Sequence, residues 1–197
     1  APGIDISGKE GGTAYVNQGS SNGEDLHLHT WYHWAVNWDG SKLRAYFDGR
    51  LIEESGTIST DLTTTLADQS FYLGQDLVST DRYAQAFYHD VRLQTGSSAV
   101  TYTGSTYSIP TTALDTDSDT KFHLASGLPY INDPKGGTVT PTGEVEMRRF
   151  IPYDHEAYSV NDHGASVHFD GDDDVRKTGY TNPIGTGDYT VECWVYP

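Results

Sequence analysis

The sequence has 197 residues, of which 36% are hydrophobic and 12% aromatic, and its formal net charge is −16. This length and composition suit one large domain with a real apolar core, or one domain with an extension. The acidity argues against nucleic acid or an anionic membrane surface as a partner, and since no apolar run of about 18 residues occurs we expect no membrane insertion. The single cysteine, Cys193, excludes an intrachain disulfide.

Strand-forming segments with alternating residues fill the first half of the chain. Asp39-Gly40 and Asp48-Gly49 each lie between two such segments, and this pattern predicts hairpins because glycine accepts the positive φ of a tight turn. The β-branched run of threonines at 63–65 favours a loop over a helix for residues 57–67. Strands are predicted at 13–16, 31–38, 43–47, 51–54, 70–74 and 85–94.

The composition changes at about residue 98, and Thr, Ser, Gly and Pro dominate as far as 162. We interpret this stretch as an ordered connector, with short strands near 121–124, Val139 and 143–150. A strand and turn at 165–171 and a strand at 188–196 follow. In the last strand, alternation places Tyr189, Val191, Cys193 and Val195 on one face, and Thr190, Glu192, Trp194 and Tyr196 on the other.

Several ordered motifs resemble the LamG-like domains of the concanavalin A-like lectin/glucanase superfamily. The hairpin segments 30–36 and 43–49 resemble the core of such a domain, 71–74 resembles the strand that follows, and 87–93 resembles the closing strand. The resemblance implies an all-β jelly-roll sandwich. Since no comparably specific catalytic signature occurs in the sequence, we expect the chain to be non-enzymatic.

Two further motifs resemble the opening strands of the same domain but occur late in the chain, at 167–174 and 187–197. The order is therefore the back part of a LamG-like sandwich (1–97), a connector (98–162) and the front strands (163–197). Three explanations remain open. The chain is a circular permutant closed on itself, one period of a tandem protein, or a subunit whose front strands complete a neighbouring copy.

Half of a jelly roll would expose unpaired strand edges, which soluble proteins avoid. A head-to-tail contact that does not close produces a filament. We therefore expect a structural or adhesive fibre, outside the cell, at a cell surface or on a virion, whose partners are copies of the same chain. The alternative is a calcium-dependent carbohydrate-binding module with glycans as partners.

The resemblance also implies a structural Ca²⁺ site, because Asp90 and the Asp170-Gly171-Asp172-Asp173 turn would lie close together in such a sandwich. Clustered carboxylates provide the oxygen ligands that calcium prefers. The predicted metal ligands are Asp90, Asp170, Asp172 and Asp173. The alternative is that Asp170-Gly171 is only a hairpin turn and that Asp90 acts as a cap or pairs with Arg92.

Four other patterns point to chemistry less specifically. Asp115, Asp117 and Asp119 alternate like a calcium loop, but Thr120 and Ser126 stand where an EF-hand needs Gly and Glu, so we expect a turn before the next strand.

Three histidines share strand parity, namely His27, His29 and His33. Three imidazoles on one face could bind zinc together with a water, but we expect these to be sheet-surface residues. Glu144 and Glu146 resemble part of a glucanase motif, but Arg149 takes the place of the third acid, so we reject a glycosidase.

The tryptophans at 31, 34, 38 and 194 could stack on sugars or fill the core, and the sequence designates no carbohydrate-binding residue.

Overall fold

A computed structural model describes residues 6–10, 13–18, 27–57, 69–74, 84–96, 99, 102–124, 138–153, 165–180 and 187–197. Every regular element in these ranges is a β-strand, which confirms the all-β class. Within the same ranges there is no helix of the length and hydrophobicity needed to cross a bilayer. The loop expected at 57–67 lies almost entirely outside the described residues.

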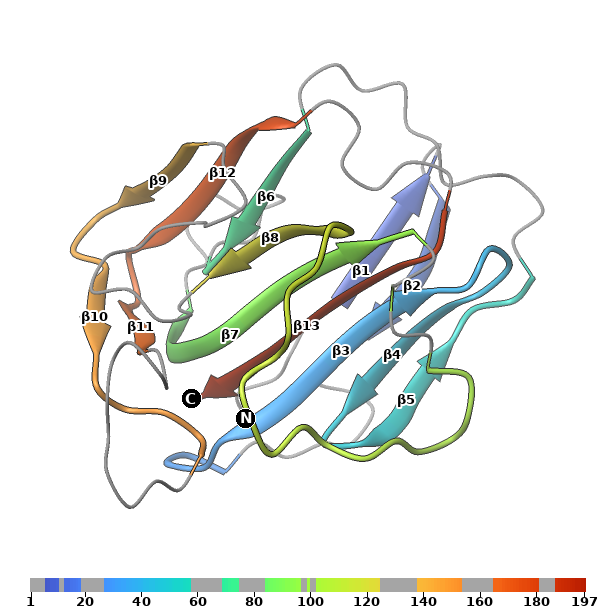
Figure 1. Cartoon of the computed structure of the whole chain (residues 1–197), viewed down its shortest axis with the longest axis horizontal. Helices are drawn as coiled ribbons and strands as arrows, with labels where there is room; N and C mark the ends of the chain where they lie inside the picture. The colour runs from blue at the N-terminus through green and yellow to red at the C-terminus, as the bar shows by residue number, and fades with distance from the viewer. Residues whose placement is uncertain are drawn as a thin grey trace.

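The larger layer is an eight-stranded antiparallel sheet (Figure 1). Its order is β10-β11-β7-β13-β3-β4-β5, and β8 pairs with β7 beside this path. The strands are β3 (Tyr32–Trp38), β4 (Leu43–Phe47), β5 (Arg50–Glu54), β7 (Gln85–Thr95), β8 (Thr120–Leu124), β10 (Glu146–Arg148), β11 (Ser166–Asp170) and β13 (Tyr189–Tyr196).

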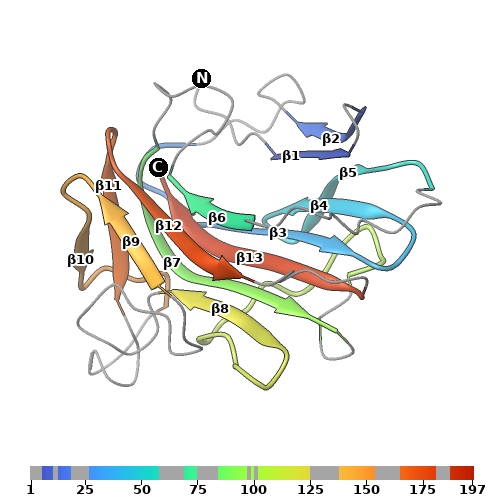
Figure 2. The ribbon, with the colours of Figure 1, turned by 90° about the horizontal axis from the view of Figure 1, so that it is seen from above.

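A smaller sheet of three strands, in the order β6-β12-β9, forms a second layer (Figure 2). Its strands are β6 (Gln69–Leu73), β9 (Thr138–Thr142) and β12 (Asp174–Tyr180). A separate hairpin of β1 (Ile6–Glu10) and β2 (Thr13–Gln18) lies beside β4 and β5. Neither β1 nor β12 follows from the alternation in the sequence, whereas the predicted strands of the connector appear as β8, β9 and β10.

The apolar core lies between the two sheets. Leu73 of β6 and Val175 of β12 pack against the inner face of the large sheet, where Phe122, Phe169 and Cys193 are buried. The predicted two-sided pattern of β13 is confirmed, because Tyr189, Cys193 and Val195 belong to apolar clusters. Thr190 and Glu192, of the opposite parity, face the other side of the sheet and are also buried.

Both Asp-Gly hairpins form as predicted. The β3–β4 turn contains Gly40 with φ +85°, and the Asp39 carboxylate accepts the Ser41 and Lys42 amides at 2.9 and 2.8 Å. Between β4 and β5, both Asp48 and Gly49 have positive φ, 49° and 76°, as a two-residue hairpin turn requires.

Part of the connector runs across the outer face of the large sheet (Figure 1). We call residues 102–119 the strap. At the β5 edge, Thr106 bridges Arg50, and the amide of Tyr107 donates to the carbonyl of Gly49 at 2.9 Å. A Cβ at Gly49 would lie 2.8 Å from the Tyr107 carbonyl oxygen, so glycine permits this close approach.

The late strand β13 occupies the middle of the large sheet. It pairs with β3 from Tyr189↔Trp38 to Val195↔Tyr32, and with β7 on its other side. The strand β11 pairs with β7 as well. In the structure of a single chain, therefore, the segments that resemble opening strands pair with the segments that resemble the back part of a sandwich.

Candidate functional site

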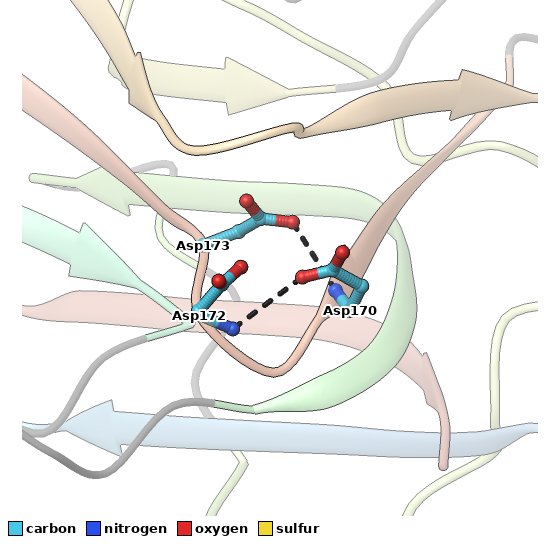
Figure 3. A group of neighbouring side chains, drawn as sticks. All are labelled: Asp170, Asp172 and Asp173. Carbon is cyan, nitrogen blue, oxygen red and sulfur yellow. Dashed lines mark hydrogen bonds between the residues drawn. The ribbon is translucent and has the colours of Figure 1, made fainter.

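Three carboxylates gather at the turn between β11 and β12 (Figure 3). One oxygen from each of Asp170, Asp172 and Asp173 lies within 4.8 Å of the others. The Asp170 carboxylate accepts the Asp172 amide at 3.4 Å, and the Asp173 carboxylate accepts the Asp170 amide at 3.2 Å. The structure thus brings together three of the four predicted metal ligands, in a spacing that suits a hard cation such as calcium.

The electrostatics of this turn reflect like charges held close together. The hydrogen bond to Asp170 and the charge of that carboxylate raise the pKa of Asp172, whereas the same hydrogen bond lowers the pKa of Asp170. A divalent cation would relieve this repulsion by taking the place of the shared proton. Cation binding at this turn would consequently weaken in acid.

Asp173 also has a structural role. Its side chain is buried, and it accepts the backbone amide of Glu144 from the β9–β10 turn as well as the amide of Asp170. The two turns approach so closely that a Cβ at Gly143 would meet the Asp173 carboxylate. The turn is therefore an ordered connection from the large sheet to the small one. The alternative of a hairpin turn is wrong, because β11 pairs with β10 and β7 whereas β12 pairs with β6 and β9.

The predicted fourth ligand, Asp90, does not reach this turn. In the β7–β11 pairing, Asp170 stands opposite Gln85, and Asp90 lies five positions farther along β7. At about 3.3 Å per residue, this separates the two by roughly 16 Å. The expectation that Asp90 joins the acidic turn is wrong, because Asp90 lies where β7 has left β11 and pairs with β8 and β13.

Asp90 lies at a β-bulge in the middle of β7. Its φ is +56°, and it stands with Val91 opposite the single residue Cys193. Aspartate tolerates this left-handed conformation better than most residues. The bulge directs the carboxylate into a buried position, where the side chain is 1% exposed.

Both oxygens of the Asp90 carboxylate have partners from other segments. His123 Nε2 of β8 bonds to Oδ1, while the Leu114 amide, at 2.6 Å, and the Tyr153 hydroxyl, at 3.2 Å, donate to Oδ2. Burial opposes ionisation, but His123, His89 and the Leu114 amide outweigh it and lower the pKa of Asp90. The alternative pairing of Asp90 with Arg92 does not form either, because Arg92 pairs with Glu192.

The residues around Glu192 form a buried polar network that sequence reasoning missed. Arg92 Nε donates to Glu192 Oε1 at 3.1 Å and its Nη2 contacts the same oxygen, while the Tyr102 hydroxyl donates to Oε2 at 3.1 Å. Glu192 is fully buried. The only sequence signal was the charged residue on the polar side of β13, which alternation assigns to solvent unless another segment covers it.

His33 on β3 belongs to the same network. Its Nδ1 is hydrogen-bonded to the Tyr107 hydroxyl, and its Nε2 lies 3.7 Å from Glu192 Oε2. Burial lowers the pKa of His33 from 6.5 to about 4, and Arg92 reinforces this effect although Asp90 opposes it. The imidazole is therefore neutral at pH 7.

The other acidic patterns form turns and surface pairs. Asp117 Oδ1 accepts the amides of Asp119 and Thr120, at 2.9 and 3.0 Å, so this segment is a turn before β8, as predicted. Among the described residues, the cluster of Asp170, Asp172 and Asp173 is the one group of three potential metal ligands, so neither this turn nor the three histidines forms such a group. Glu146 is exposed and pairs with Arg148.

The tryptophans do not form an exposed platform. Trp38 is buried and Trp34 packs against the inner core. The indole of Trp194 donates to the Tyr153 hydroxyl at 2.9 Å. Trp31 packs against Phe150 and Tyr196 with ring centroids at 5.2 and 5.4 Å.

Two antiparallel sheets packed around an apolar core define a jelly-roll-type β-sandwich. The family model described as the concanavalin A-like lectin/glucanases superfamily (Laminin_G_3) matches residues 3–101, and the chain belongs to this family. Neither curated proteins nor solved structures give a match. The matched residues include β1–β7 but none of β8–β13, although β11 and β13 lie in the same large sheet.

Proposed function

We propose that this chain is a non-enzymatic structural or adhesive module that forms an extracellular or virion fibre by head-to-tail strand sharing or tandem repetition. Laminin G-like domains are generally non-enzymatic and typically extracellular, which supports the class and the location. The observation that carries the proposal is the central position of β13, a strand from far along the chain, between β3 and β7.

Without β13, both β3 and β7 would present free edges in the middle of the large sheet. Free edges accept any strand of the right register and side-chain pattern. The β13 of a neighbouring copy is identical to the chain's own β13, so it would make the same pairs with β3 and β7. Exchange of this strand joins copies head to tail, and such a contact propagates unless the rotation closes a ring.

A disulfide at the β3–β13 junction tests strand sharing. Trp34 stands directly opposite Cys193, which is the only cysteine. Directly paired side chains lie close enough for a disulfide after a small adjustment. The variant Trp34→Cys, oxidised over a range of protein concentrations, should give a ladder of crosslinked species on a non-reducing gel if neighbours exchange β13. The double variant Trp34→Cys/Cys193→Ser is the control and should give no crosslink.

A crosslinked monomer at every concentration would contradict strand sharing. Electron microscopy and analytical ultracentrifugation of the unmodified protein provide the second measurement. Filaments, or assembly that grows with concentration, support the fibre. A monodisperse particle of 21.7 kDa would overturn assembly of separate copies and would leave tandem covalent repetition to be tested on the native chain length.

The acidic turn favours a second candidate, a calcium-dependent carbohydrate-binding module. Three convergent carboxylates supply part of the six to eight oxygens that calcium takes, and backbone carbonyls or water would have to supply the others. Calcium bound only to the folded state would raise the melting temperature. We expect that rise to disappear in Asp172→Asn and to persist in the control Asp115→Asn, whose carboxylate lies outside the turn.

No calcium-dependent shift in the unsubstituted protein would contradict the metal site. The carbohydrate step needs its own measurement, namely binding to a glycan array with calcium and with a chelator. Binding that is lost with the chelator and in Asp172→Asn supports this candidate. Absence of binding with calcium present contradicts it.

A further inference from the structure

The outer face of the large sheet is polar but does not face solvent. His33 and Asn37 of β3, Glu192 of β13 and Arg92 of β7 share this face, and each is at most 5% exposed. The amide of Asn37 has no hydrogen-bond partner among the described residues. This face buries polar and charged side chains, whereas the inner face buries mainly apolar ones.

Two parts of the connector cover this face. The strap contributes the Tyr102 hydroxyl to Glu192, the Tyr107 hydroxyl to His33, and the Asp115 carbonyl to Arg92 Nη1 at 2.6 Å. The second part, residues 149–153, adds Tyr153 over Trp194 and Phe150 over Trp31 and Tyr196. We call the two parts together the cover.

One carboxylate of the sheet contacts both parts of the cover. Asp90 accepts the Leu114 amide from the strap and the Tyr153 hydroxyl from residues 149–153, and His123 holds its other oxygen. The sandwich on the inner face is held differently, by buried apolar side chains such as Phe122, Phe169 and Val175. Acid changes the charge of the groups that hold the cover, whereas it leaves the apolar packing of the inner face unchanged.

We propose that the cover is an acid-released device, which detaches from the outer face while the sandwich beneath it stays folded. Release would uncover the Glu192–Arg92 network and Trp194. It would also uncover Tyr46, whose hydroxyl donates to the carbonyls of Tyr102 and Gly104 in the strap at 2.8 and 2.9 Å. The proposal does not depend on whether copies of the chain assemble, since both parts of the cover contact their own chain.

The direction of the pH effect follows from the two groups that the cover buries. His33, whose pKa is about 4 when covered, would return toward 6.5 once solvated, so protonation between these values favours the open form. Asp90, whose pKa is lowered when covered, loses its fastening charge only in stronger acid. The groups facing these two residues are Glu192, Arg92, Asp48, His89, His123, Tyr102, Tyr107 and Tyr153, and the Asp48 carboxylate accepts the His33 amide at 3.1 Å.

Residue-resolved amide exchange at pH 7.5 and pH 4.5 tests the proposal. The reporters for the cover are the amides of Leu114 and Tyr107, which bond to Asp90 and to Gly49. The reporters for the sandwich are amides of β3 and β13. Protection of the cover should fall at least tenfold in acid, and the His33 shift allows a fall on the order of 10²-fold. Protection of β3 and β13 should change less than twofold.

Two variants separate the contributions. Asp90→Asn keeps the shape and tolerates positive φ but removes the charge, so it should expose both parts of the cover already at pH 7.5. His33→Gln should flatten the response between pH 6.5 and 4. The control Asp117→Asn alters a carboxylate at the end of the strap that bonds Gln94, and it should leave the amides of Leu114 and Tyr107 protected.

Equal loss of protection in the cover and in β3 and β13 would show one cooperative unit and overturn the proposal. Unchanged protection of the cover at pH 4.5 would overturn it as well. If Asp90→Asn does not fold, the pH comparison on the unsubstituted protein still decides between these outcomes.

Discussion

The two faces of the large sheet are buried by different means. On the inner face, Leu93, Val167 and Phe169 pack against the smaller sheet. On the outer face, Arg92 of β7 and Glu192 of β13 are buried beneath the strap. Apolar packing is non-directional and tolerates small shifts, whereas a buried charge is costly as soon as its partner is lost. The difference implies that single substitutions will affect the two faces through different mechanisms.

The largest effect is expected on the inner face from Phe169→Ala. Phe169 is fully buried in the main core cluster. Truncation removes buried apolar surface and leaves a cavity, which should lower the free energy of unfolding by about 3–5 kcal/mol. Urea denaturation measures this loss. A loss below about 1 kcal/mol would contradict the position of this ring in the core.

On the outer face, Arg92→Met should cost nearly as much, about 3 kcal/mol, because Glu192 would keep a buried charge without its partner. The matched control is the double variant Arg92→Met/Glu192→Met, which removes both charges. The double variant should recover at least half of the loss in urea denaturation. If the losses instead add, the two side chains do not form a buried pair.

A smaller effect is expected from Tyr107→Phe, which removes one hydroxyl from the contact between strap and sheet. The substitution leaves His33 Nδ1 without the hydrogen bond of that hydroxyl, at a cost of about 1–2 kcal/mol. The same loss should shrink when His33→Gln is the background, as a double-mutant cycle would measure. Independent effects would show that the two groups do not interact.

The smallest effect on stability is expected from a substitution of an exposed residue that belongs to neither buried face. Arg148 pairs with Glu146 on β10, and both side chains are more than half exposed. Solvent screens such a pair, so Arg148→Ala should change stability by no more than about 0.5 kcal/mol. Thermal melting is sensitive enough to check this. A larger loss would mean that the β10 edge is covered in solution.

Local signals in the sequence predicted the local structure well. Asp48-Gly49 specified a hairpin turn, and alternation along β13 separated Cys193 and Val195 from Thr190 and Glu192. Alternation cannot show which segment lies over the outer face of the sheet. The strap is rich in Thr and Ser and has no regular strand, so nothing in its pattern indicates that it lies over Glu192.

The sequence likewise predicted only the local part of the candidate metal site. The three aspartates of the β11–β12 turn are neighbours in sequence, so their proximity follows from the turn itself. The position of Asp90 depends on pairing between distant strands and on the bulge opposite Cys193. A one-residue irregularity changes which way a side chain points, and composition gives no indication of it.

The position of β13 also affects the order of events during synthesis. Residues 189–196 leave the ribosome well over a hundred residues after β3, and until then β3 and β7 cannot complete the large sheet. Pairing of such distant segments slows folding, and until it occurs the unpaired edges of β3 and β7 can pair with other chains. We therefore expect the nascent chain to be most prone to aggregation just before its last described strand is made.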